Sequence, residues 1–124
     1  MNVDKNAPRV LVVEDDDAIA LVLEDLLVSE GFAVERATNG AVALELLPEF
    51  RPNVIVLDLM MPVLDGWGFR VRQRGLSAEL ATIPVVVLSG AREATTAAIE
   101  MQAASVVVKP FVLDALVDAI RGAS

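Results

Sequence analysis

Short runs of apolar residues recur along this chain, and each run is followed by polar or turn-forming residues. Five of the runs are rich in Val, Leu or Ile and have the length of a β-strand. They cover residues 9–13, 32–37, 53–57, 83–88 and 105–108. Continuous apolar runs suit strands that are buried on both faces of a parallel sheet. Glu35 and Arg36 interrupt the second run, so this run predicts an edge strand.

Segments with helical periodicity lie between the predicted strands. The first apolar stripe consists of Ile19, Val22, Leu23, Leu26 and Leu27. Its spacing predicts a helix that buries one face, with Asp16 or Asp17 as the N-cap and Gly31 at the end. The other helices are predicted at residues 40–47, 66–74, 92–102 and 112–121. Asn39 would cap the second helix and Pro48 would close it.

Strands and helices alternate five times, which predicts an α/β domain with a parallel sheet and right-handed crossovers. The chain has 124 residues, a length that fits one domain with a substantial core. We expect this domain to span residues 9–122. Residues 1–8 contain no apolar run, and we expect them to form a flexible N-terminal segment.

Three arginines alternate along the predicted helix at residues 66–74. Arg70, Arg72 and Arg74 do not fall on one helical face. A solvated surface is the simpler interpretation of this pattern. A basic patch that contacts a partner protein is the alternative interpretation.

Composition narrows the chemistry that the chain can perform. It has no cysteine and no histidine, which excludes disulfides, thiolate metal sites, cysteine nucleophiles and serine-type triads. Lysine occurs only at Lys5 and Lys109. Any chemistry must therefore rest on carboxylates, hydroxyls and very few amines.

The net charge of −8 argues against direct binding to nucleic acid or to an anionic membrane surface. The first eight residues do not resemble a signal peptide, and no apolar run approaches the ~18 residues that a membrane-spanning helix needs. We therefore expect a soluble cytoplasmic domain with neither nucleic acid nor membrane as a direct partner.

Polar side chains gather where four of the predicted strands end. Four consecutive acids, Glu14 to Asp17, follow the first strand, while Asp58, Ser89 and Lys109 follow the third, fourth and fifth strands. In open parallel sheets, binding sites form outside the carboxyl ends of the strands. A lone carboxylate at the end of a buried strand is unfavourable for stability, which favours a functional role for Asp58.

Electrostatics indicates what such a site binds. Two carboxylates ~5 Å apart repel by roughly 3 kcal/mol at an effective dielectric constant of ~20. Glu14, Asp15 and Asp58 would therefore cost about 10 kcal/mol if all three are ionised and close together. Lys109 alone cannot offset this repulsion, whereas a divalent cation can. An all-oxygen site with open positions suits Mg²⁺, which retains water ligands and bridges to phosphate.

With Mg²⁺ bound, Asp58 becomes a candidate nucleophile toward phosphorus and would form an acyl phosphate. Mg²⁺ and Lys109 would neutralise the transferring oxygens, and Ser89 would donate a hydrogen bond to one of them. A solvated helix N-terminus would explain the acidic run by itself. It would not explain the ordered combination of that run with Asp58, Ser89 and Lys109.

These residues carry a resemblance to a known family. The chain resembles the receiver domains of bacterial two-component response regulators, the family of the chemotaxis response regulator, from RVLVVEDD near its start to KPF near its end. The shared parts are the acid pair after the first strand, the segment DLMMPVLDG around Asp58, the hydroxyl after the fourth strand and the Lys109-Pro110 pair. The resemblance implies a flavodoxin-like (βα)5 doubly wound sheet with strand order 2-1-3-4-5.

The resemblance assigns Asp58 as the phosphoacceptor of a two-component system or phosphorelay. The phosphoryl donor would be the phosphohistidine of a histidine kinase or of a phosphotransfer protein. The chain would assist its own phosphorylation and dephosphorylation and would not otherwise be an enzyme. Ser89 and Lys109 would contact the phosphoryl group, and the Lys109-Pro110 peptide bond would be cis.

The same resemblance implies a set of metal ligands. Asp15, Asp58 and the backbone carbonyl of Met60 would bind Mg²⁺ directly, and Glu14 would bind it through a water molecule. Asp16 is then a helix cap rather than a ligand.

An output surface is also implied. Phosphorylation would switch the protein-protein interactions of the face formed by residues 92–102, 105–108 and 112–121. The family usually has Tyr or Phe three residues before the lysine, and the inward swing of that ring carries the signal to the surface. Here the position is Val106, whose short, stiff side chain cannot make this swing. Ser89 also replaces the commoner threonine. The route of output is therefore open.

Other classes of protein fit less well. A Mg²⁺-dependent phosphatase of the haloacid dehalogenase type needs a second Asp two residues after the nucleophile, where this chain has Met60. In a flavodoxin, the acids after the first strand would repel the phosphate of the flavin. The alternative that stays open is a receiver-like interaction module that signals without phosphorylation, and Val106 is its only support.

Overall fold

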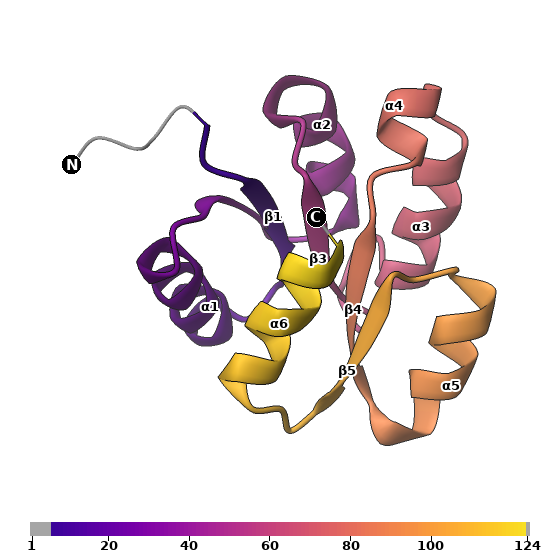
Figure 1. The fold of residues 1–124 in the computed structure, drawn as a ribbon. Coiled ribbons are helices and arrows are strands. Elements are labelled where there is room, and N and C mark those ends of the chain that lie inside the picture. Colours follow the sequence, from indigo (N-terminus) through magenta and orange to yellow (C-terminus); the bar gives the residue numbers. More distant parts are fainter. Residues whose placement is uncertain (1–5, 124) are drawn as a thin grey trace.

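The computed structural model describes residues 6–123, which form one parallel sheet between two layers of helices (Figure 1). The strands are β1 (Arg9–Val13), β2 (Ala33–Ala37), β3 (Val54–Asp58), β4 (Val85–Gly90) and β5 (Ser105–Lys109). Their order is β2-β1-β3-β4-β5, and each neighbouring pair is parallel. The predicted fold class and strand order are confirmed, and β2 lies at an edge as predicted.

Within residues 6–123, six helices accompany the sheet. They are α1 (Asp17–Ser29), α2 (Gly40–Phe50), α3 (Gly66–Arg74), α4 (Ala78–Ala81), α5 (Ala91–Glu100) and α6 (Leu113–Ala123). The prediction of five helices is wrong because it missed α4, whose four residues are too short to show a helical period. None of the helices in the described part of the chain is long and apolar enough to cross a membrane.

Separate apolar layers cover the two faces of the sheet, because alternate side chains of a strand point to opposite faces. Leu11 and Ile55 pack on the face that α2, α3 and α5 cover. Val12 and Val56 pack on the other face, against α1 and α6. Figure 1 shows α1 and α6 on one side of the sheet and α2, α3 and α5 on the other. Burial on both faces explains why the central strands are continuous apolar runs.

Two helices begin at the caps that the sequence predicts. Asp16 accepts a hydrogen bond from the amide of Ile19 at 3.0 Å and thereby caps α1, which decides between Asp16 and Asp17. Asn39 caps α2 by accepting from the amide of Val42 at 3.0 Å. Gly31 follows the end of α1 with φ at 94°, a conformation that favours glycine.

α2 continues past its predicted end to Phe50 and contains Pro48 in its last turn. Proline removes one backbone donor, and near a C-terminus this loss affects a single hydrogen bond. The helix instead ends at Arg51, where φ is 48° and the amide donates to the carbonyl of Leu47 at 3.0 Å. The prediction that Pro48 closes this helix is wrong.

Arg70 of α3 does not lie on a solvated surface, since it is only 8% exposed. Its guanidinium donates to the carbonyls of Met101 at 2.8 Å and Gln102 at 3.3 Å, and to the side-chain oxygen of Gln73 at 2.8 Å. The other two arginines of the helix are exposed. The surface interpretation is therefore wrong for Arg70, because carbonyls at the end of α5 satisfy its donors away from water.

Residues 1–5 of the expected flexible segment lie outside the described residues. Pro8 is described, and its carbonyl accepts a hydrogen bond from the amide of Ala33 at 3.0 Å. This bond continues the pairing of β1 with β2 by one residue beyond Arg9.

Candidate functional site

The carboxyl edge of the sheet brings the predicted site residues together. β3 ends with Asp58, β4 ends with Ser89 and Gly90, and β5 ends with Lys109. Gly90 lies beside Lys109 in the register of β4 and β5. Because β1 and β3 are neighbours, the acids that follow β1 lie next to the end of β3.

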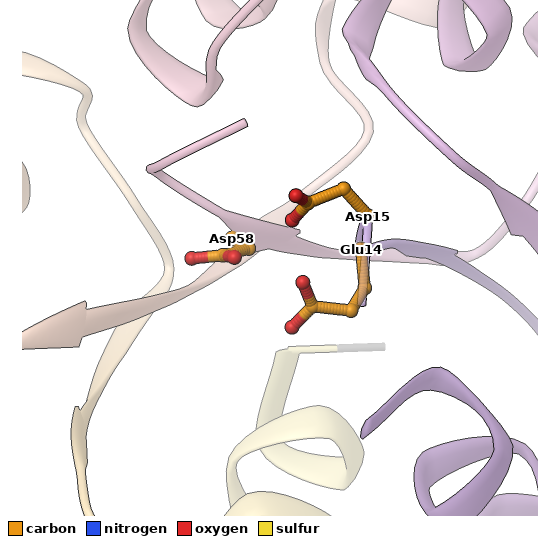
Figure 2. A group of neighbouring side chains, drawn as sticks. All are labelled: Glu14, Asp15 and Asp58. Carbon is orange, nitrogen blue, oxygen red and sulfur yellow. The ribbon is translucent and has the colours of Figure 1, made fainter. Parts of the chain in front are cut away.

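Three carboxyl groups converge at this edge. Glu14, Asp15 and Asp58 each offer one oxygen, and these oxygens lie within 4.8 Å of one another. Figure 2 shows the carboxyl groups of Glu14 and Asp15, which are adjacent in the chain, on the side that faces Asp58. Glu14 is 1% exposed and Asp58 is 5% exposed, while Asp15 is open to solvent. The cluster is therefore mostly buried, with one accessible member.

Glu14 has one buried oxygen without a hydrogen bond. Its Oε2 accepts from the amide of Asp16 at 3.3 Å, whereas its Oε1 has no partner within residues 6–123. Burial is the main cause that raises the pKa of Glu14 from 4.5 to about 7, and interactions with Asp58 add to it. Both observations indicate that the protein alone provides too little positive charge for this carboxyl group.

The residues present fit a divalent cation of the Mg²⁺ type. Their ligand atoms are all oxygens, and Asp15 leaves part of the cluster open to solvent. Mg²⁺ prefers oxygen ligands and retains several waters, so a partly open carboxylate cluster suits it. A cation here would satisfy Oε1 of Glu14 and offset the repulsion between the carboxylates.

Asp58 also contacts the positive charge that the sequence predicts. The Nζ atom of Lys109 lies 3.0 Å from Oδ1 of Asp58, and the lysine side chain is 35% exposed. The pair lies in a cleft of about 230 Å³, which is lined by Asp58, Leu59, Met60, Leu88, Ser89, Gly90, Glu93 and Lys109. Asp58 therefore faces a space into which a small group can enter, with a cation beside it.

Ser89 lines the same cleft but does not contact the carboxylate. Its hydroxyl donates to the carbonyl of Gly90 at 3.0 Å, and the residue is 3% exposed. The structure thus places Ser89 in the same cleft as Asp58 and Lys109, with its hydroxyl hydrogen-bonded to the neighbouring carbonyl of Gly90.

The loop after Asp58 folds back tightly against the strand. The amide of Met60 lies 3.4 Å from Oδ1 of Asp58 and donates to it. A methyl group on Gly66 would lie 2.8 Å from the carbonyl oxygen of Asp58, so only glycine allows this approach. Val63 has φ at 68°, an unfavourable conformation for a β-branched residue.

Val106 occupies the place where the resemblance predicts an aromatic ring. It pairs with Val87 in the sheet and packs, half-buried, against the apolar layer under α5. The Lys109-Pro110 peptide bond that follows β5 is cis, as predicted.

Two residues near the site were not predicted as part of it. Arg36 donates through Nε and Nη2 to the carbonyl of Glu14 at 3.1 and 2.9 Å, and its Nη1 lies 2.7 Å from Asp17. Arg36 thereby holds the acidic loop in place. The sequence feature that could have indicated this role is a charged residue near the end of an edge strand. Glu93 lies in the first turn of α5 and lines the cleft. The sequence feature that could have indicated Glu93 is that a helix begins directly after Ser89 and Gly90.

This chain matches the family model of the response regulator receiver domain over residues 10–121. It belongs to this family. The receiver domain is 41% identical over 123 residues to the transcriptional regulatory protein PrrA of Mycobacterium tuberculosis, a match that covers 98% of this chain and 52% of that protein. It is 38% identical over 118 residues to the transcriptional regulatory protein AfsQ1 of Streptomyces coelicolor, covering 91% and 51%. The chain spans about half the length of these relatives.

Solved structures of receiver domains share the fold. The chemotaxis protein CheY4 of Vibrio cholerae has a TM-score of 0.85 and 27% identity, with 95% of this chain and 99% of that chain covered. The signal receiver domain of a signal transduction histidine kinase from Syntrophus aciditrophicus has a TM-score of 0.84 and 30% identity, with coverage of 93% and 88%. Receiver domains are signalling modules rather than classical enzymes.

Proposed function

We propose that residues 9–122 form a phosphoacceptor receiver domain in which Asp58 accepts a phosphoryl group from a phosphohistidine. The donor is a histidine kinase or a phosphotransfer protein, and the reaction takes place in the cytoplasm. One observation carries the proposal: the buried carboxylate of Asp58 lies 3.0 Å from Lys109 and within 4.8 Å of two further carboxylates. Membership of the receiver family supports the same function.

In the transfer step, a carboxylate oxygen of Asp58 attacks the phosphorus of the donor. The new P–O bond forms while the P–N bond to the donor imidazole breaks, and its electron pair returns to the imidazole nitrogen. The ammonium group of Lys109 is close enough to Asp58 to stabilise negative charge on the transferring oxygens. Ser89 is expected to release the carbonyl of Gly90 and donate its hydroxyl to the phosphoryl group instead.

A Mg²⁺ ion would be held by Asp15, Asp58 and the backbone carbonyl of Met60, with Glu14 acting through water. The ion supplies positive charge that lowers the cost of bringing an anionic phosphoryl group to an acidic cluster. The unsatisfied Oε1 atom of Glu14 and the all-oxygen donor set support this assignment.

The output surface that we propose is the face formed by α5, β5 and α6. α5 begins directly after Ser89 and Gly90, and β5 ends with Lys109, so both elements continue from residues of the site. With Val106 in place of an aromatic ring, a change at the site would reach this face through movement of α5 itself rather than through a swinging side chain.

Incubation with acetyl phosphate and MgCl₂, followed by intact-mass measurement, tests this function. We expect the parent protein to gain the mass of one phosphoryl group, and the gain to require Mg²⁺. Asp58→Asn should show no gain because its amide is not a nucleophile toward phosphorus. Asp25→Asn, which removes an exposed carboxylate of α1, is the matched control and should be labelled like the parent.

A parent protein that remains unlabelled with excess donor and Mg²⁺ would instead support a receiver-like interaction module without phosphorylation. Labelling that persists in Asp58→Asn would place the phosphoacceptor elsewhere. Hydrogen exchange tests the output surface in the same samples, since we expect changed amide protection in α5, β5 and α6. Changes confined to the loops around Asp58 would contradict the proposed output surface.

A further inference from the structure

Glu93 places an additional carboxylate at the cleft that contains Asp58. It lies in the first turn of α5 and lines the cleft together with Asp58, Ser89 and Lys109. The residue is half-buried, so its charge is only partly exposed to water. It is not one of the three acids that form the metal-type cluster.

The carboxyl group of Glu93 lies against the backbone of Gly90. A methyl group built on Gly90 would lie 3.1 Å from Oε2 of Glu93. Gly90 directly follows Ser89 and lies beside Lys109 in the sheet. The absence of a side chain at Gly90 therefore lets the carboxylate approach the end of β4, next to the residues expected to contact a phosphoryl group.

No cation of the described residues neutralises Glu93. Within residues 6–123, the ion pairs do not include it, and no hydrogen bond to its side chain is formed. Lys109 is the one basic residue among those lining the cleft in the described part of the chain, and it pairs with Asp58. An anion that enters the cleft therefore meets the charge of Glu93, which no ion pair within residues 6–123 offsets.

We propose that Glu93 is a specificity-determining residue that disfavours small phosphodonors in proportion to the negative charge they carry. The inference rests on the proposed phosphorylation of Asp58. A free acyl phosphate must enter against the field of Glu93 with little other binding energy to offset it. A donor that carries less negative charge meets less repulsion from Glu93, so its transfer is slowed less.

Initial rates of labelling by two small donors test the role of Glu93. With acetyl phosphate, a carboxylate oxygen of Asp58 bonds to phosphorus while the P–O bond to the acetyl group breaks and acetate leaves with the electron pair. Phosphoramidate is the second donor and carries less negative charge at neutral pH. Rates are measured by intact mass in excess MgCl₂ at low and high KCl for the parent, Glu93→Gln and Glu100→Gln.

Glu93→Gln should be labelled by acetyl phosphate about three- to tenfold faster than the parent at low salt. The increase should be smaller with phosphoramidate and should shrink at high salt, because salt screens the charge. Glu100→Gln removes the same charge from the exposed far end of α5 and should leave both rates within about twofold of the parent. A gain in rate cannot result from loss of folding.

Equal acetyl phosphate rates in Glu93→Gln and parent would overturn the inference, as would the same increase in Glu100→Gln. Dephosphorylation is followed separately after removal of the donor. A variant that changes only this rate would also overturn the role in donor choice. If the parent is not labelled by either donor, the proposed function fails and this inference fails with it. If the parent is labelled and Glu93→Gln has the same labelling rate, the inference about Glu93 fails while the proposed function stands.

Discussion

Within residues 6–123, charged side chains are buried in two places, and in one of these places a buried oxygen lacks a hydrogen-bond partner. Arg70 is enclosed between α3 and the end of α5, where three acceptors take up its donors. At the carboxyl edge of the sheet, Glu14 is even less exposed, yet one of its oxygens has no hydrogen-bond partner within residues 6–123. The first arrangement is complete without a ligand, and the second is not.

The network around Arg70 explains why a buried cation is tolerated between two helices. Burial, followed by repulsion from Arg74, lowers the pKa of Arg70, although an arginine remains charged in a protein. Gln73 accepts from Arg70 and donates to the carbonyls of Leu80 and Ile83 at 3.0 and 3.1 Å. Apart from Gln73, every acceptor in this network is a backbone carbonyl, which is typical of a structural role.

The acidic cluster has the opposite character. Its carboxyl groups repel one another, and the pKa of Glu14 is raised to about 7. An unsatisfied buried oxygen costs stability, and such a cost persists at sites that bind something. The comparison therefore separates a buried charge with a structural role from a buried carboxyl group whose unsatisfied oxygen fits the proposed cation site.

Removing the satisfied charge should have the largest effect on stability. Arg70→Ala leaves the carbonyls of Met101 and Gln102 and the amide oxygen of Gln73 without their donor, and it leaves a void between α3 and α5. We expect the free energy of unfolding in urea to fall by about 4 kcal/mol. Arg72→Ala, an exposed change in the same helix, should cost less than about 0.5 kcal/mol. Similar losses in both variants would contradict the structural role of Arg70.

The second prediction concerns pH in the absence of divalent cations. Glu14 binds its proton more tightly in the folded state than in the unfolded chain, so stability falls as the pH rises from about 4.5 to about 7. The contribution of Glu14 to this fall is about 3 kcal/mol, since one pKa unit corresponds to about 1.4 kcal/mol. Urea unfolding in a chelator at pH 5 and pH 8 measures it.

Glu14→Gln should remove this part of the pH dependence and be more stable than the parent at pH 8. The exposed Glu45→Gln provides the control and should retain the pH dependence of the parent. A parent and a Glu14→Gln variant with the same pH profile would show that the buried oxygen of Glu14 carries no such cost.

Addition of Mg²⁺ should stabilise the acidic cluster and leave the Arg70 network unaffected. At ten times its Kd, an ion that binds only the folded state adds about 1.4 kcal/mol to the free energy of unfolding. The shift should disappear in Asp58→Asn and persist in Arg72→Ala. Thermal unfolding across a MgCl₂ titration checks this, and an equal shift in Asp58→Asn would place the cation elsewhere.

The smallest expected effect concerns backbone strain, which distinguishes the loop beside the acidic cluster. Val63 has a positive φ, and its side chain is 84% exposed, so no burial offsets the strain. Val63→Asn should raise the free energy of unfolding by about 1 kcal/mol, because asparagine tolerates this conformation. Val71→Asn, at an exposed position of α3, should change it by less than about 0.5 kcal/mol. A loss of stability in Val63→Asn would show that valine is not strained there.

Much of the acidic site was predictable because its residues follow strands that are easy to recognise. Asp58, Ser89 and Lys109 each end a continuous apolar run, and a parallel sheet brings such ends to one edge. Arg36 and Glu93 escaped prediction because each reaches the site from the side. Their contacts depend on how β2 and α5 lie against the ends of β1 and β4.

The sequence alone determined the α/β architecture and the cap at Asn39, and it predicted which acids follow the strands, since these follow from local patterns and from the ends of strands. Only the tertiary structure decided that Arg70 is buried with hydrogen-bond partners and that Glu14 has a buried oxygen without one within residues 6–123. A side chain's hydrogen-bond partners depend on which backbone groups packing brings within reach, and the two backbone carbonyls that accept from Arg70 lie more than thirty residues away in the sequence. Local sequence pattern predicts which element carries a charged residue, and tertiary packing decides whether its side chain finds hydrogen-bond partners.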